Sequence, residues 1–417
     1  MAFERVGIRP ARILLPAPSV PRETWACIAC DQYTSEPEYW KKAYETVGDA
    51  PSALRLILPE VNLNKAAELI PGIHAAMAEY LREGLLIPAV DPGFILCERT
   101  VPSGTRLGLV CAVDLEQYSF EKGSLPLVRP TEQTIASRLP PRLVIRRGAP
   151  VELTHIMILI DDPGRTVLEP LRKKESGLRQ VYDFELMMNG GHLKGWAVDA
   201  AEDLAHVENS LEKLLEKLGA DPLLLAVGDG NHSLATAKAY WNEIRETLGE
   251  EERETHPARY ALCEIVNIHD EALLFEPIHR VVTGADPEKL MADWEKYAAE
   301  RGMALDAAEG HTFTVVTGKG DRQVTVGNPE GMIPCETIQK FLDDFLARNK
   351  GAEIDYIHGE QSLRNLASAD GATGFLLPEI DKHSFFADVK KLGVLPRKTF
   401  SMGEADEKRF YMEAKGI

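Results

Sequence analysis

The chain has 417 residues and a formal net charge of −18, from 47 lysines and arginines against 65 aspartates and glutamates. Hydrophobic residues make up 44% and charged residues 27%, an ordinary globular composition that supplies a core large enough to fold without disulfide bonds. The acidic balance argues against a nucleic-acid partner, which needs clustered cations, and the sequence has no run of about 18 apolar residues that would predict a membrane partner.

The first 20 residues read as an extended, proline-rich segment with early charges, and they lack the apolar region of a signal peptide. We therefore expect a cytoplasmic protein. A helix is predicted over residues 35–50, with Ser35 as its cap and Pro37 in its first turn. A second helix is predicted over residues 62–85. The apolar runs that follow predict strands over residues 93–98, 106–113 and 155–160.

In the second half of the chain, strand and helix patterns alternate. Residues 178–198 predict two strands around the turn NGGH, and residues 199–218 predict a helix that ends at Gly219. The other predicted elements are strands over 223–227, 260–268, 272–278 and 373–379, a hairpin over 311–327, and helices over 232–248, 336–349 and 382–392.

This alternation, with hairpins interspersed, favours a mixed α/β or α+β fold with mixed sheets over a purely doubly wound sheet. We expect one unit over residues 1–417 with two subdomains. A boundary fits either near 195–220 or near 280–305. We take an N-terminal α/β part over 1–195 and a C-terminal α/β part over 196–417.

Cys27 and Cys30 form a CxxC pair, a spacing that fits a redox pair or half of a zinc site. The other four cysteines stand alone, so no second pair of zinc ligands exists at metal spacing. We expect no zinc and thiols that are structural or incidental. A hydrolase with Cys27 or Cys30 as nucleophile is the least favoured function, because neither thiol has a cationic neighbour in the sequence.

The stretch GDGNHS, residues 228–233, joins a predicted strand to a predicted helix. The first N–H groups of a helix are unpaired, and the helix dipole places partial positive charge there. Gly228 and Gly230 allow positive φ and the close approach of a ligand. The pattern therefore predicts an anion site of the strand–loop–helix kind, with phosphate as the usual guest at Gly230, Asn231 and Ser233.

Two side chains of this stretch carry candidate chemistry. Asp229 fits a general base, or a ligand to a Mg²⁺ ion that bridges phosphates, and His232 fits a proton carrier or a donor to a phosphoryl oxygen. In the alternative interpretation, Asp229 or Asn231 simply caps the helix.

Several other polar residues follow apolar strands, and the strand ends of α/β proteins are where sites assemble. We expect Asp229 and His232 to line a concave pocket with at least two of them. Glu132 is a catalytic candidate, Arg280, Arg397 and Lys398 are phosphate-binding candidates, and Asp31, His279 and His358 are further pocket candidates.

GDGNHSLATA resembles the DGHHR…TA signature of a widespread prokaryotic family of unknown function, and the resemblance runs nearly end to end. Further family elements occur in chain order as RYALCEIVNIHD, EPIHR, DYIHG and LPRKTF, and ACDQY and PTEQT stand at two earlier element positions. The signature is itself similar to a box of the ParB, sulfiredoxin and free-serine-kinase group, which binds nucleotide phosphates at a helix N-terminus. This sequence departs from the signature at Asn231 and Ser233, where the family has histidine and arginine.

The resemblance implies phosphoryl transfer or nucleotide binding. The leading hypothesis is a phosphotransferase that uses ATP or ADP with Mg²⁺ on a small hydroxylated metabolite such as free serine, with Asp229 or Glu132 as base or metal ligand. The alternative is a non-catalytic regulator that binds nucleotide, since Ser233 removes the bidentate phosphate donor of the family arginine.

Overall fold

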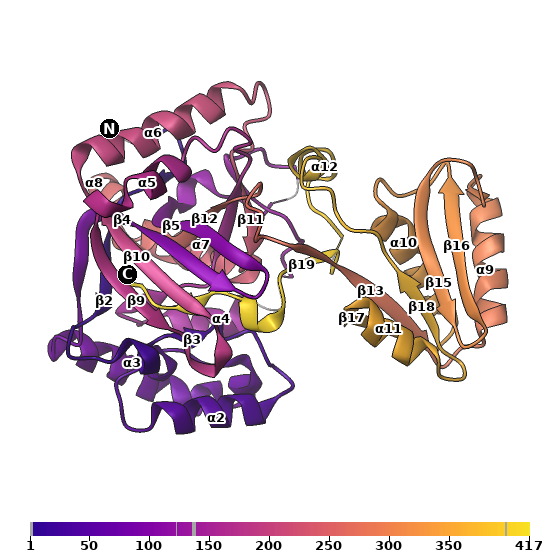
Figure 1. The fold of residues 1–417 in the computed structure, drawn as a ribbon, viewed down its shortest axis with the longest axis horizontal. Coiled ribbons are helices and arrows are strands. Elements are labelled where there is room, and N and C mark those ends of the chain that lie inside the picture. Colours follow the sequence, from indigo (N-terminus) through magenta and orange to yellow (C-terminus); the bar gives the residue numbers. More distant parts are fainter. Residues whose placement is uncertain (1–2, 122, 136–138, 397) are drawn as a thin grey trace. The chain divides into compact units, whose positions relative to one another are not determined.

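The computed structural model describes residues 3–121, 123–135, 139–396 and 398–417, and the chain forms two compact units. Unit 1 comprises residues 1–274 and 403–417, and unit 2 comprises residues 275–402. The division expected at 195/196 falls inside a strand of unit 1. Both units mix strands and helices, as the sequence predicts (Figure 1).

Unit 1 is built on a large mixed sheet with strand order β6-β11-β8-β12-β5-β4-β2-β21-β7. Its strands are β1 (Ile8–Arg9), β2 (Ala11–Pro16), β4 (Leu86–Val101), β5 (Gly104–Asp114), β6 (Val128–Pro130), β7 (Val151–Leu153), β8 (Met157–Ile160), β9 (Arg179–Glu185), β10 (His192–Val198), β11 (Leu225–Asp229), β12 (Tyr260–Asn267) and β21 (Ala414–Gly416). A separate ribbon pairs β3 (Cys27–Ile28) with β20 (Phe410–Tyr411).

The helices of unit 1 are α1 (Arg22–Trp25), α2 (Pro37–Val47), α3 (Ala66–Arg82), α4 (Leu139–Arg146), α5 (Glu169–Lys173), α6 (Ala201–Glu216), α7 (Asn231–Arg245) and α8 (Glu250–Thr255). Ser35 is not the cap of α2. The N-cap position is Glu36, without a side-chain cap hydrogen bond, and Pro37 occupies the first turn. Pro71 lies inside α3.

Neighbouring residues of the central strands point to opposite faces of the sheet, and both faces are covered. Ile95 of β4 and Val110 of β5 pack in the core that contains residues of α2 and α3. Leu96 and Leu109 pack in the core that contains residues of α6 and α7. Burial on both faces explains why these strands read as unbroken apolar runs.

Unit 2 has a second sheet with order β14-β16-β15-β18-β13-β17, and β19 also pairs with β13. Its elements are β13 (Phe275–Thr283), α9 (Pro287–Glu300), β14 (Ala304–Leu305), β15 (His311–Thr317), β16 (Gly320–Gly327), α10 (Pro334–Arg348), β17 (Glu353–His358), α11 (Glu360–Ala367), β18 (Thr373–Leu376), α12 (Phe385–Leu392) and β19 (Phe400–Met402). Val282 shares a core with residues of α9 and α10, and its neighbour Val281 packs with Leu363 of α11, so these helices cover opposite faces.

The C-terminal segment of unit 1 is held by buried ion pairs. Arg409 Nε contacts Glu264 Oε2 of β12 at 2.7 Å, and its Nη2 contacts Glu413 Oε2 at 2.8 Å. Burial disfavours the Arg409 cation, but Glu413 and Glu264 outweigh it and raise its pKa. Gly108 makes room for Glu264, because a Cβ at that position would lie 2.2 Å from Glu264 Oε1.

Among the described residues, no helix combines the length and the apolar character that a bilayer span requires.

We expect Arg409→Met to lower the free energy of unfolding by about 3–5 kcal/mol, because it leaves the carboxylates of Glu264 and Glu413 buried without their cation. Asp199→Asn breaks an exposed pair with Arg179 and serves as the control, with a cost below about 1 kcal/mol. Urea unfolding of both variants measures the difference. Equal costs would contradict the role of this network.

Candidate functional site

The turn between β11 and α7 has the backbone that the sequence predicts. β11 ends at Asp229, α7 begins at Asn231, and Gly230 between them has φ of +75°. A Cβ on Gly230 would lie 2.9 Å from the Cα of Ile156. The position therefore requires glycine for two reasons, its positive φ and this close contact. Gly228 is part of β11.

Gly230 is the N-cap of α7 and makes no side-chain cap hydrogen bond, so the interpretation of Asp229 or Asn231 as a simple helix cap is wrong. Asp229 Oδ1 accepts a hydrogen bond from the Gly230 N–H at 2.8 Å, one residue before the helix. Asn231 is buried, and its side chain bonds to other segments of the backbone: its Oδ1 accepts a hydrogen bond from the Thr131 N–H and its Nδ2 donates one to the Val227 carbonyl. The first turn of α7 thus lacks a side-chain cap from its N-cap residue, as the predicted anion site requires, and that site stays a prediction.

A buried histidine adjoins this turn. The Nε2 of His155 lies 3.0 Å from Ser233 Oγ and 3.4 Å from Asp31 Oδ2, and its Nδ1 lies 2.6 Å from the hydroxyl of Tyr411. Burial raises the pKa of Tyr411 well above its ordinary value, so the phenol keeps its proton in its hydrogen bond with Nδ1.

Two carboxylates and one ammonium group complete the arrangement. Lys408 Nζ lies 3.3 Å from Asp229 Oδ2. Burial disfavours the Asp31 carboxylate, but His155, Gln32 and Lys408 together outweigh burial and lower its pKa. Asp31 therefore stays ionised beside His155. We call Asp31, His155, Asp229, Lys408 and the first turn of α7 the turn site.

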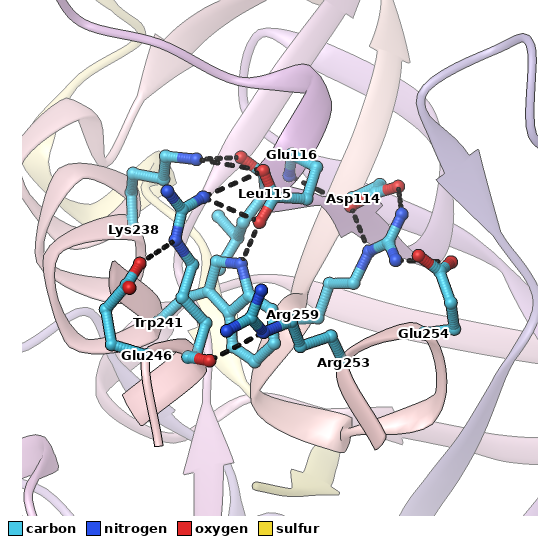
Figure 2. Close-up of polar contacts among 10 residues, drawn as sticks. Asp114, Leu115, Glu116, Lys238, Trp241, Glu246, Arg253, Glu254 and Arg259 are labelled. Carbon is cyan, nitrogen blue, oxygen red and sulfur yellow. Dashed lines mark hydrogen bonds and ion pairs between the residues drawn. The ribbon is translucent and has the colours of Figure 1, made fainter. Parts of the chain in front are cut away.

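Polar contacts at the far end of α7 hold the helix in place (Figure 2). Glu116, just after β5, accepts hydrogen bonds from Trp241 Nε1 at 2.5 Å and Arg245 Nη1 at 3.0 Å, and Lys238 donates to the Leu115 carbonyl at 2.8 Å. The turn site therefore stands on an anchored helix, which helps to preserve its geometry.

The other candidates of unit 1 lie near the same turn. His232 Nε2 accepts a hydrogen bond from the Ile135 N–H at 3.3 Å. Glu132 is half-buried and directly follows Thr131, whose N–H bonds to Asn231. The catalytic role of Glu132 stays a prediction.

The remaining candidates belong to unit 2. His279 and Arg280 are buried in β13, and Arg280 donates to Gln339 Oε1 at 3.1 Å and to Cys335 Sγ at 3.0 Å. His358 ends β17 and is exposed, as is Lys398, whose φ is +55°. Arg397 lies outside the described residues. Their roles as phosphate-binding and pocket residues stay predictions.

The thiols of the CxxC pair are protected. Burial, followed by the charge of Asp31, raises the pKa of Cys30 to about 12, and burial raises that of Cys27 well above its ordinary value. Thiolates are therefore disfavoured at both positions, which weighs against a cysteine nucleophile. Within the described parts of the chain, no group of three or more His, Cys, Asp or Glu side chains is placed to hold a metal ion.

Reasoning from the sequence missed three members of the arrangement: His155, Lys408 and Tyr411. His155 comes just before the apolar run of β8, so a histidine at a strand edge was a usable signal. Lys408 and Tyr411 lie in the C-terminal segment, whose return to unit 1 has no local signature in the sequence.

The fold and the turn site define a mixed α/β protein whose candidate site lies at a strand–turn–helix junction. The chain belongs to the family described as "Protein of unknown function (DUF1015)", whose profile matches residues 8–345. A comparison with curated proteins gives no match.

Solved structures with weak overall similarity include three relevant chains. A free serine kinase in complex with AMP is 12% identical, with 73% of this chain and 90% of that chain covered and a TM-score of 0.39. A conserved hypothetical protein from Pyrococcus furiosus is 12% identical, with coverage of 74% and 94% and a TM-score of 0.36. SbnI with C-terminal truncation from Staphylococcus aureus is 11% identical, with coverage of 70% and 83% and a TM-score of 0.35.

We expect Gly230→Ala to be more costly than an alanine at another glycine with positive φ. Gly219 has φ of +67° with no atom within 4 Å of an added Cβ, so Gly219→Ala reports the backbone strain alone, about 1–2 kcal/mol. Gly230→Ala adds the collision with Ile156 and should exceed the control by about 1 kcal/mol or more. Urea unfolding measures both. A cost no larger than that of Gly219→Ala would show that the turn tolerates a Cβ.

His279 should make the stability of the protein depend on pH. Burial, followed by Arg280 and His358, lowers its pKa to about 4, although Glu360 acts in the opposite sense, and its Nδ1 accepts a hydrogen bond from the Leu377 N–H at 3.1 Å. In the unfolded chain His279 is protonated below its pKa of about 6.5, whereas in the folded chain it is protonated only below about pH 4. Between these two values the unfolded chain therefore binds one more proton than the folded chain. The free energy of unfolding should therefore fall as the pH drops through this window.

The test is urea unfolding between pH 4 and pH 7. His279→Gln keeps an acceptor for Leu377 and should flatten the slope, whereas His383→Gln, at an exposed position that is not among the groups shifting the pKa of His279, should leave it unchanged. A slope that survives in His279→Gln would assign the pH dependence to another group.

Proposed function

We propose that this protein is a nucleotide-dependent phosphotransferase that acts on a small hydroxylated metabolite. The observation that carries the proposal is the first turn of α7, whose N-cap residue makes no side-chain cap hydrogen bond, next to the Asp229–Lys408 pair and the Asp31–His155 pair. Phosphoryl transfer depends mainly on positioning and charge neutralisation, and these groups supply both.

The phosphates of ATP or ADP would bind the N–H groups over Gly230 to Ser233, where the helix dipole is positive. Lys408 would neutralise part of their charge. Asp229 repels an anion, but its Oδ1 is bonded to the Gly230 N–H and its Oδ2 pairs with Lys408. A Mg²⁺ ion at Asp229 would take its other ligands from the phosphates and from water, as this ion commonly does.

The reaction would use Asp31 as the base. The acceptor hydroxyl gives its proton to the Asp31 carboxylate, and its oxygen forms a bond to the terminal phosphorus of the nucleotide. The bond between that phosphorus and the bridging oxygen breaks, and the electron pair leaves with the shortened nucleotide. His155 keeps Asp31 ionised and oriented before the transfer.

One observation favours the second candidate, a regulator that binds nucleotide without turnover. The family arginine is replaced by Ser233, and Ser233 Oγ bonds to His155 rather than offering a cation to phosphate. The two candidates share the nucleotide site and differ in whether Asp31 accepts a proton.

Calorimetric titration should show binding of ATP or ADP that strengthens with Mg²⁺ and weakens in His232→Ala, because His232 stands in the first turn of α7. His206→Ala, on α6, is the matched control and should bind as the unchanged protein does. Asp31→Asn should keep nucleotide affinity but lower turnover by about 10²–10⁴-fold, as the loss of a general base does.

These arms separate the candidates. Nucleotide binding without turnover in the unchanged protein, across a panel of alcohols and hydroxy amino acids, would favour the regulator. If no nucleotide binds below about millimolar concentration under any of these conditions, which corresponds to about −4 kcal/mol, both candidates fail.

A further inference from the structure

Unit 1 contains an apolar cavity of about 140 Å³ that reaches the turn site. Most of its wall is aliphatic, and the side chains that define it are Leu56, Ile57, Leu58, Leu63, Met77 and Ile145. His155, Ser233 and Tyr411 also line it, so the wall includes the groups whose hydrogen bonds orient the ring of His155. We call this space the aliphatic cavity.

The charges on the wall of the aliphatic cavity are largely cancelled in pairs. Glu60 pairs with Arg142, and Glu152 lies 2.5 Å from Arg146 Nη2. The buried Nε of Arg146 has no hydrogen-bond partner among the described residues. The cavity thus offers an apolar volume with few polar groups, the usual make-up of a small-molecule pocket, and one donor still to be satisfied.

The volume sets the size of the guest. An apolar protein cavity of about 150 Å³ holds benzene, so the aliphatic cavity has room for a group of about six carbons. Free serine has no such group and would leave the cavity unfilled. Because His155 and Ser233 stand on its wall, a guest in the cavity can place a hydroxyl next to them and to Asp31.

We propose that the aliphatic cavity binds the apolar body of the acceptor substrate, an aromatic or branched aliphatic alcohol whose hydroxyl lies at His155 and Ser233. This inference rests on the proposed function for the fate of the hydroxyl, but the binding itself does not require a nucleotide. A phenyl-sized group buried there should improve affinity over serine by about tenfold or more, as burial of apolar surface does.

The test uses 4-fluorobenzyl alcohol as the probe and L-serine as its polar counterpart. Fluorine NMR titration of the full chain should show saturable binding of the probe, which L-serine does not displace. Ala149→Leu and Leu63→Phe, both at lining positions, should weaken binding at least tenfold, because they fill the cavity. Ala89→Leu, half-buried in the same core but not among the described lining residues, should bind as the unchanged protein does.

A readout on the unchanged protein keeps the test decisive if the filled variants do not fold. The methyl resonance of Met77 should shift with the probe, and that of Met303, in unit 2, should not. Absence of a Met77 shift, displacement of the probe by L-serine, or unchanged affinity in folded Ala149→Leu and Leu63→Phe would each overturn the inference.

Titration of ATP into the same proteins distinguishes this inference from the proposed function. If the probe binds, the cavity-filling variants abolish its binding and no protein binds nucleotide, the result supports the cavity proposal and contradicts the proposed phosphotransferase function. If nucleotide binds but the probe does not bind up to about 50 mM, the cavity proposal is contradicted and the proposed phosphotransferase function is not. That limit corresponds to an affinity weaker than the burial of a benzene-sized group predicts.

Discussion

The pairing of Arg409 with Glu264 and Glu413 is the interaction on which the turn site depends. Burying an ion is costly unless it is paired, so these three side chains are stable only when the C-terminal segment lies in one register against β12. A shift of one residue would separate Arg409 from Glu264. That register also fixes Lys408 beside Asp229 and Tyr411 beside His155. The chemistry of the site is thus built on a constraint in the core.

The departure from the family signature at Ser233 gains a physical meaning from this arrangement. The hydroxyl of Ser233 bonds to Nε2 of His155, the ring nitrogen that also faces Asp31. In the proposed function, the cation that an arginine would supply would come instead from Lys408, on a different part of the chain. The replacement would exchange a bidentate donor for a point charge.

Local patterns in the sequence were enough to predict most elements, the mixed α/β class and the turn at Gly230, because apolar periodicity and glycine act over a few residues. Ser35 failed as a cap because Pro37 lies in the first turn of α2 and Glu36 becomes the N-cap. Long-range relations could not be read in this way. β13 follows β12 after a short connection, and no linker marks the division at 274/275 or the return at 402/403. For the same reason Lys408 and Tyr411 were not recognised.

The charges around the turn are balanced rather than cationic, and this bears on what can bind there. Asp31 and Asp229 carry negative charge, while Lys408 and the helix dipole oppose it. The whole chain adds a formal charge of −18, which repels free anions at long range when salt is low. A bare phosphate gains from the helix N-terminus but meets Asp229. A phosphate that carries a divalent cation gains from both, because the metal charge reverses the effect of that carboxylate. In the proposed function, the charges at the turn would therefore favour a phosphate that carries a divalent cation over a bare anion.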